Sequence, residues 1–402
     1  MKNAIFCLMT FAVLLFSTGC QKDTSASLAG ESTAMTSSEI VQFLDNLFLE
    51  ELQESPQSMT YLGMRERYNE WNDISDAARD KSLGMTRDHL NRVMAIDLSQ
   101  ANDSVKLSVK MFIQQANKAL EGDRWRYHSY PVNQMRGVHG MIPSFLINQH
   151  LIANKDEAKA YIERITNSAI LLRQVIEQLE IRQQKGIIAP KFVFPLVMAS
   201  IDNILKGAPF SEGQDSTIFA DFKAKIAKLE LSEADKTELT AAASAALQNS
   251  LAPGYYELQT ALRSLEANAT NDHGVWKFPD GEQFYNFALQ RTTTTNLTAE
   301  QIHNRGLEEV ARIQSEMLEI MNTVGFKGDL QAFFAFMRDD PRFYFPDTPE
   351  GKQAYLDQAT KLINDMKARL DELFITKPKA DLVVKAVEPF REASAGQAFY
   401  QR

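Results

Sequence analysis

The stretch TSSEIVQFLDNLFLEEL, residues 36–52, determines the fold class that we expect for this chain. It opens with Thr36 and Glu39 in capping-box spacing, in which a hydroxyl and a carboxylate satisfy the first free N–H groups of a helix. Behind this cap, apolar residues recur at helical spacing: Ile40, Phe43, Leu44, Leu47, Phe48 and Leu52. The stretch therefore predicts an amphipathic helix at the start of the folded part of the chain.

Similar amphipathic runs follow along the chain, and we expect an all-α, bundle-like array. The runs cover about 76–96, 103–121, 155–185, 191–207, 215–229, 232–267, 298–323 and 350–374, with breakers at Gly186, Gly207, Pro253-Gly254 and Pro279-Asp280-Gly281.

The strand signal is confined to two short segments. Residues 381–388 (DLVVKAVE), between Pro378 and Pro389, predict a strand near the C-terminus, and residues 191–197 (KFVFPLV) are a lesser candidate because Pro195 interrupts them. We therefore expect one or two short strands. A strand needs a partner, and the sequence ends at Arg402, so we expect the fold to be incomplete without a continuation.

The region before the first helix reads as a targeting segment. Lys2 precedes the apolar run 4–16, which is too short to span a bilayer but has the length of a signal core. Ser17-Thr18-Gly19-Cys20 is similar to a bacterial lipobox, although Ser17 stands where Leu is usual. We expect a signal peptide at 1–19, lipidation of Cys20, a flexible tether over 20–36 and a helical domain over 37–402. The alternative is ordinary cleavage with Cys20 as a free thiol.

The lipidated Cys20 would be the only cysteine of the mature chain, since Cys7 lies in the signal, so no disulfide is expected. Acyl chains on Cys20 would anchor the protein to a membrane. Because Gln21, and not Asp, follows the cysteine, we expect the outer membrane, with the protein facing the periplasm.

Composition and motifs exclude several function classes. With 43 basic and 52 acidic residues, net −9, the chain lacks the positive balance of a nucleic-acid binder. It has no phosphate-binding glycine motif, so we expect no nucleotide, and no G-x-S-x-G or H-E-x-x-H, so we assign no catalytic or metal-binding residue. Glu300 and His303 are spaced like metal ligands, but they lack companions and read as a helix surface.

The other carboxylates that draw attention, Glu308, Glu309 and Glu316, stand close to Arg312. Their spacing is typical of ion pairs on a solvated helix face.

Three segments differ in composition from ordinary amphipathic helices. Residues 130–143 (YPVNQMRGVHGMIP) read as a structured interhelix loop or, alternatively, as a ligand-facing one. Residues 276–297 hold a Pro-Asp-Gly turn and four threonines, after which Thr298 and Gln301 can form a second capping box. Residues 389–402 are rich in Ser, Gly and Ala.

Together these three segments resemble the bacterial family named domain of unknown function 885, over roughly residues 40–402. The resemblance rests on YPVNQM at 130–135, RTTTTNLTAEQIH at 291–303 and FREASAGQAFYQ at 390–401. It implies a secreted or lipid-anchored helical protein that continues into a helix bearing H-E-x-x-P-G-H-H, as in gluzincin-type zinc metallopeptidases.

No part of that motif occurs in these 402 residues. Zinc and a peptide substrate are therefore expected only in a protein that carries the motif. In this chain the resemblance implies at most two residues at the rim of a cleft, Arg391 and Tyr400.

Three functions remain open. The chain is the N-terminal portion of a zinc-peptidase-like lipoprotein, inactive alone; or a complete, non-catalytic binding or assembly lipoprotein of the envelope; or an enzyme of another kind that uses Arg291, His303 and the threonine loop. We favour the first.

Overall fold

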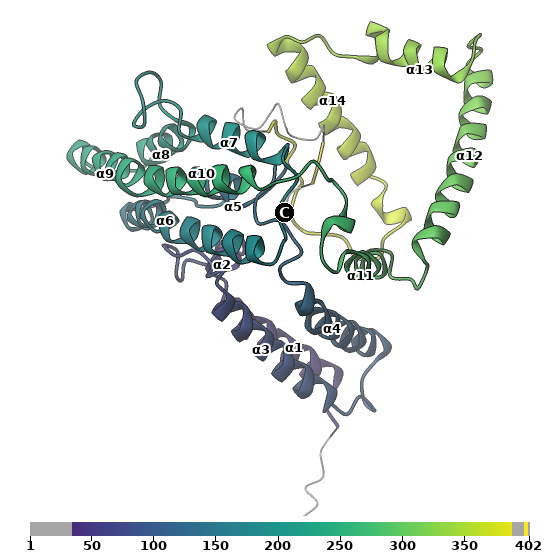
Figure 1. Ribbon diagram of the computed structural model, residues 1–402, viewed down its shortest axis with the longest axis horizontal. Helices are drawn as coiled ribbons and strands as arrows, with labels where there is room; N and C mark the ends of the chain where they lie inside the picture. The colour runs from purple at the N-terminus through teal and green to yellow at the C-terminus, as the bar shows by residue number, and fades with distance from the viewer. Residues whose placement is uncertain (1–33, 388–397, 401–402) are drawn as a thin grey trace, which may run out of the picture.

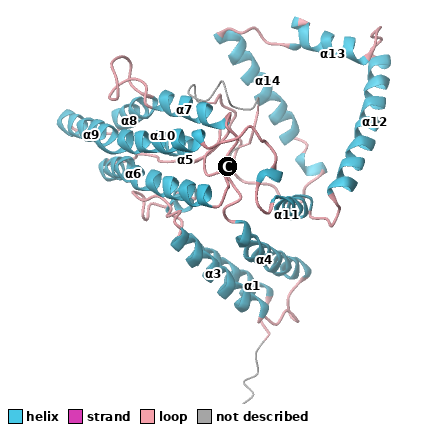
Figure 2. Cartoon of the chain, viewed as in Figure 1, coloured by secondary structure: helices cyan, strands magenta, loops and turns pink. Residues whose placement is uncertain are grey.

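The computed structural model describes residues 34–387 and 398–400 of the chain. Within this part the protein is helical throughout, and Figure 2 shows helices joined by loops without a strand. The all-α prediction is confirmed. The only β-type pairings among these residues are the isolated bridges Val132–Gly137 and Ala208–Asp215.

Three groups of helices follow one another along the chain (Figure 1). The N-terminal group comprises α1 (Ser37–Leu52), α2 (Pro56–Tyr61), α3 (Asp76–Met94) and α4 (Asp103–Gly122). The central body comprises α5 (Val138–Asn148), α6 (Lys155–Gln184), α7 (Val193–Ile204), α8 (Thr217–Ala227), α9 (Glu233–Ala246) and α10 (Ala252–Ala267). The arm comprises α11 (Gly281–Thr293), α12 (Ala299–Thr323), α13 (Leu330–Asp339) and α14 (Pro349–Lys367).

Side-chain caps explain where many helices begin. Thr36 accepts a hydrogen bond from the Glu39 N–H while the Glu39 carboxylate accepts one from the Thr36 N–H, so the predicted capping box is confirmed. The second capping box, at Thr298 and Gln301, is also confirmed. Single caps by Ser75, Asn102, Asn154, Ser232, Asp329 and Thr348 start α3, α4, α6, α9, α13 and α14.

Helix α6 forms the centre of the body. It packs against α10, α9 and α5, and its apolar face contributes Tyr161, Ile165, Leu172 and Val175 to a core in which each of them has no exposed surface. A separate, smaller core joins α1 to α3 and α4.

The predicted break at Pro253-Gly254 is wrong. A π-helical turn, Leu247–Leu251, joins α9 to α10 without a loop, and Pro253 lies in the first turn of α10, where a missing N–H costs nothing. Gly254 lets α10 approach α6, because a Cβ there would lie 3.0 Å from Leu172 Cδ1. The glycine serves close packing and not chain reversal.

Both strand predictions are wrong over the described residues. Residues 381–387 pair with no other segment and form no strand; residue 388 lies outside the described part. A β-branched run needs a partner strand to form a ladder, and residues 381–387 are held instead by side-chain bonds, from Lys367 Nζ to Asp381 Oδ1 and from Lys385 Nζ to Asn148 Oδ1 at 3.3 Å. Residues 191–197 instead enter α7, whose apolar residues Val193, Phe194 and Val197 are buried in the body.

Candidate functional site

Two of the three site residues expected from the sequence lie outside the described part of the chain. Cys20 and Arg391 lie there, so the lipid anchor and one rim residue stay predictions. Tyr400 is described and is 72% exposed. The signal and tether over 1–33 are likewise outside, and none of the described helices is long and apolar enough to cross a membrane.

The segment 130–143 proves to be half turn and half helix. Asn133 Oδ1 accepts hydrogen bonds from the N–H groups of Met135 (2.9 Å) and Arg136 (3.0 Å), which folds residues 133–136 into a tight turn. Gly137, at φ +151°, closes this turn, since a Cβ there would lie 2.8 Å from Val132 Cα. The loop interpretation is correct for 130–137 and wrong for 138–143, which belong to α5.

The first turn of α5 holds the buried histidine of this segment. His139 is 4% exposed, its Nδ1 has no hydrogen-bond partner, and the Tyr255 hydroxyl donates to its carbonyl oxygen at 2.6 Å. Burial lowers the pKa of His139 to about 4, so the imidazole is neutral at pH 7. The hydrogen bond from Tyr255 on α10 to His139 on α5 fixes the two helices against each other.

A ring cluster attaches the segment 276–297 to the N-terminal helices. His128 lies among Trp125, Phe278 and Phe284, with ring centroids 4.8, 5.7 and 4.9 Å away. Both of its ring nitrogens are buried without a partner, and burial lowers the pKa of His128. The neutral imidazole and the aromatic rings around it connect the arm to the rest of the molecule, and we call this ring cluster the joint. Its role is packing and not proton transfer.

Next to this joint, α4 and α11 enclose a polar hollow of about 220 Å³, which we call the α4–α11 hollow. On α4 it is lined by Gln114, Lys118 and Glu121, which share one helix face. On α11 it is lined by Phe287, Gln290, Arg291 and Thr294, again one face, followed by Thr295 and Asn296. The threonine loop and Arg291 therefore come together as a site.

His303 does not join them. It lies exposed on α12 with Glu300, three residues before it, and no group of three metal-ligating side chains forms among the residues that the structure describes. The predicted ion pairs of α12 are present as Arg312 to Glu309 and Glu316, while Glu308 pairs with Arg305.

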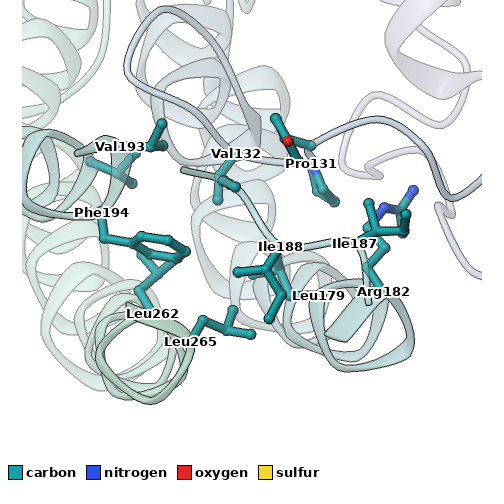
Figure 3. Close-up of a pocket in the computed structure, with 13 residues that line it drawn as sticks. Pro131, Val132, Leu179, Arg182, Ile187, Ile188, Val193, Phe194, Leu262 and Leu265 are labelled. Carbon is teal, nitrogen blue, oxygen red and sulfur yellow. The ribbon is translucent and has the colours of Figure 1, made fainter. Parts of the chain in front are cut away.

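An apolar cavity in the body offers no site. Figure 3 shows Phe194, Leu262, Leu265 and Ile188 pointing toward one another below Val132. The cavity measures about 20 Å³, roughly the room for one water molecule. At its edge Arg182 is fully engaged with the carbonyl oxygens of Ser129 (2.8 Å) and Arg126 (3.0 Å).

The most unusual buried group, Arg164, was not anticipated from the sequence. It is fully buried on α6 and donates to the Thr60 hydroxyl (2.8 Å), the Glu70 carbonyl oxygen (3.0 Å) and His150 Nδ1 (3.0 Å). Burial lowers the pKa of Arg164 to about 10, and the rings of Tyr68, Trp71 and Phe145 surround its cation. In the sequence it is one charged residue within an amphipathic run, which no pattern separates from a surface arginine.

Comparison with known proteins decides the family. The family described as bacterial protein of unknown function, DUF885, matches residues 56–402. The chain belongs to the DUF885 family. No curated protein matches the sequence.

Two solved structures are similar to this DUF885 chain. One is titled the crystal structure of the putative lipoprotein from Colwellia psychrerythraea, with 22% identity and a TM-score of 0.79 over 89% of this chain. The other is titled the structure of a putative lipoprotein of unknown function from Shewanella oneidensis, with 15% identity and a TM-score of 0.53 over 87% of this chain. At these identities the likeness establishes the fold.

The DUF885 chain spans 64% of the Colwellia protein and 60% of the Shewanella protein. Its three unusual segments have separate places in the fold. Residues 130–143 form a turn and the start of α5. Residues 276–297 contribute to the joint and to the α4–α11 hollow, and residues 389–402 are mostly outside the described part.

Proposed function

We propose that this chain is the helical N-terminal portion of a lipid-anchored envelope protein of the zinc-metallopeptidase-like type, and that it hydrolyses no peptide by itself. The family resemblance supplies the peptidase expectation, and the absence of H-E-x-x-P-G-H-H from the 402 residues supplies the expected inactivity. The titles of the two similar structures, both putative lipoproteins, agree with an anchor at Cys20.

One observation carries the proposal: the arm helices carry large apolar side chains that the described residues leave exposed. Leu307, Val310 and Ile320 on α12 and Leu362 and Met366 on α14 are each more than half exposed. Exposed apolar surface commonly marks a site where another polypeptide packs. A further polypeptide portion that packs on these side chains would explain their exposure.

The direct test is to read the source DNA beyond codon 402 in all three frames. Codons for H-E-x-x-P-G-H-H within a few dozen positions are the expected result. If none follows, the peptidase reading is overturned.

The purified chain provides a second test. It should contain no stoichiometric zinc and cleave no casein. The longer product should bind zinc and cleave casein. Zinc at one per chain, removed by a chelator with loss of cleavage, would contradict the inactivity of this portion.

The anchor can be tested separately with two cysteine variants. Cys20→Ser should abolish incorporation of labelled palmitate and release the protein from the membrane fraction, whereas Cys7→Ser, within the expected signal, should change neither. Equal labelling of the two variants would contradict lipidation at Cys20.

The body favours one alternative, a complete non-catalytic binding or assembly lipoprotein. The core around α6 joins buried side chains from α5, α6, α7, α8, α9 and α10. This alternative predicts one cooperative unfolding transition for the whole chain and little binding of an apolar dye such as ANS. The proposed function predicts strong dye binding by the arm.

A further inference from the structure

The charged side chains that line the α4–α11 hollow have no ion-pair partner among the described residues. None of Lys118, Glu121 and Arg291 forms an ion pair with any residue in the described ranges. The bonds at its rim are internal: Gln290 Nε2 donates to Asn296 Oδ1 at 3.1 Å, and Thr293 and Thr295 share a hydrogen bond between hydroxyls at 2.9 Å. The hollow thus presents charges and hydrogen-bonding groups to whatever enters it.

The walls are held at a fixed separation by the neighbouring joint. Phe287 Cζ lies 3.4 Å from the position that a Cβ on Gly122 would take, so the C-terminal end of α4 and α11 are in close contact. Phe287 also lies 6.1 Å from Trp125, ring to ring. A site between two fixed helix faces needs little ordering when a ligand binds.

The charge of the hollow comes close to zero. Lys118 and Arg291 contribute two positive charges and Glu121 one negative charge. The hollow also lies at the C-terminal turns of α4 and α11, and each helix C-terminus acts as about half a negative charge. Because these contributions cancel, neither an anion nor a cation is strongly favoured.

The hydrogen-bonding groups are mixed in kind. The hollow offers amide, ammonium and guanidinium donors, carboxylate and amide acceptors, and threonine hydroxyls that do both. The ring of Phe287 adds an apolar surface. This combination matches a ligand with many hydroxyl groups, each of which donates and accepts, and with C–H surfaces that pack on a ring.

A strained residue stands at the edge of the hollow. Thr294 ends α11 in the left-handed conformation, at φ +54°, which a β-branched residue rarely adopts. Such strain tends to be retained where it positions a side chain for function. Here it places Thr294 on the same wall as Gln290 and Arg291.

The size of the hollow sets the size of the ligand. A hollow of about 220 Å³ has room for a molecule as large as one sugar ring. We propose that the α4–α11 hollow is a binding site for a neutral, polyhydroxylated ligand of the size of one sugar ring. This inference does not depend on the peptidase-like function, because the hollow is lined wholly by described residues.

Glucose is the probe for the test, with phosphate and citrate as charged comparators. Saturation-transfer NMR on the full chain should give a glucose Kd of about 1 mM, typical of a small ligand with few contacts. The Kd should be unchanged between about 0.05 and 0.5 M NaCl, since a neutral ligand gains nothing from screened charges. No glucose signal at about ten times that Kd, or binding of citrate or phosphate in place of glucose, overturns the proposal.

Two variants with matched controls locate the site. Gln290→Ala and Glu121→Gln should each weaken glucose binding about tenfold, the size of one lost hydrogen bond to a polar or charged group. Gln331→Ala on α13 and Glu319→Gln on α12 make the same chemical changes on exposed helix positions and should change nothing. Melting curves confirm that all four variants fold, and equal glucose binding by a hollow variant and its control contradicts the site.

Discussion

Helices α6 and α12 are the two longest of the described chain, and they have opposite surroundings. α6 spans 30 residues, of which 12 are buried, while α12 spans 25 residues and buries only Met321. Both carry apolar residues at helical spacing, and α12 has the more regular pattern. The pattern therefore shows that a face is made for packing, but it does not show whether the described chain supplies the partner.

The same difference separates the body from the arm. In the body, α5, α9 and α10 pack on α6, whereas Figure 1 shows α12, α13 and α14 as an open frame to one side. Stability should consequently be concentrated in the body, and the arm should open at a lower free energy. Three experiments test this contrast between the body and the arm.

The largest effect is expected at Arg164. Arg164→Met keeps an apolar stem but leaves the Thr60 hydroxyl, the Glu70 carbonyl oxygen and His150 without their donor. We expect a loss of about 3–5 kcal/mol in the free energy of unfolding, measured by urea denaturation. The control is Arg305→Met on α12, whose exposed ion pairs should be worth less than about 1 kcal/mol. Similar losses for the two variants would contradict the contrast.

A pair of leucines compares the two helices directly. Leu172, on α6, has no exposed surface, while Leu307, on α12, is 57% exposed. Leu172→Ala should destabilise the protein by about 2–5 kcal/mol because it opens a cavity, and Leu307→Ala should stay within about 0.5 kcal/mol. If Leu307→Ala costs as much as Leu172→Ala in urea denaturation, the arm has a partner that covers it.

Acid should weaken the body in a defined pH window. The pKa of His139 is about 4 in the folded protein against 6.5 when exposed, so the unfolded chain binds the proton first. Buried, neutral His139 makes its full contribution to the free energy of unfolding above pH 6.5. This contribution is lost as the pH falls toward 4, and the loss at pH 4 is about 3 kcal/mol. Urea midpoints at pH 7 and pH 4.5 measure it.

Burial of His150, whose pKa is lowered to about 2, acts in the same direction. A stability that does not vary between pH 7 and pH 4.5 would contradict the burial of both histidines.

The sequence was sufficient for local features and insufficient for tertiary ones. The capping boxes at Thr36 and Thr298 depend on residues three apart, so their spacing alone predicts them. Gly254 looked like part of a break because its role depends on Leu172, which lies more than eighty residues earlier in the chain. Neighbours that distant leave no mark in a local pattern.

The candidate site divides in the same way. Arg291 and the threonine loop were recognised from composition, but their partners Lys118 and Glu121 look like any residues of a solvated helix face. His303 was grouped with Arg291 because the two are near in sequence, yet the turn at Thr294 directs α12 away from the hollow. The rim residue Arg391 stays a prediction.

The π-helical turn between α9 and α10 has a consequence for the evolution of this chain. Residues 233–267 run as one rod of roughly 50 Å, and the π turn accommodates one residue more than an α-helix would in the same length. Deleting a single residue within 247–251 would convert the π turn into an ordinary α-helical turn and leave the helix beyond it facing the core as before, whereas deleting one residue of α9 would turn everything beyond it by about 100°. In the second case Tyr255, Leu258 and Leu262 would leave the core and polar neighbours would enter it. The rod tolerates a change of one residue in length only at the π turn, so single-residue insertions and deletions among relatives should fall within this turn.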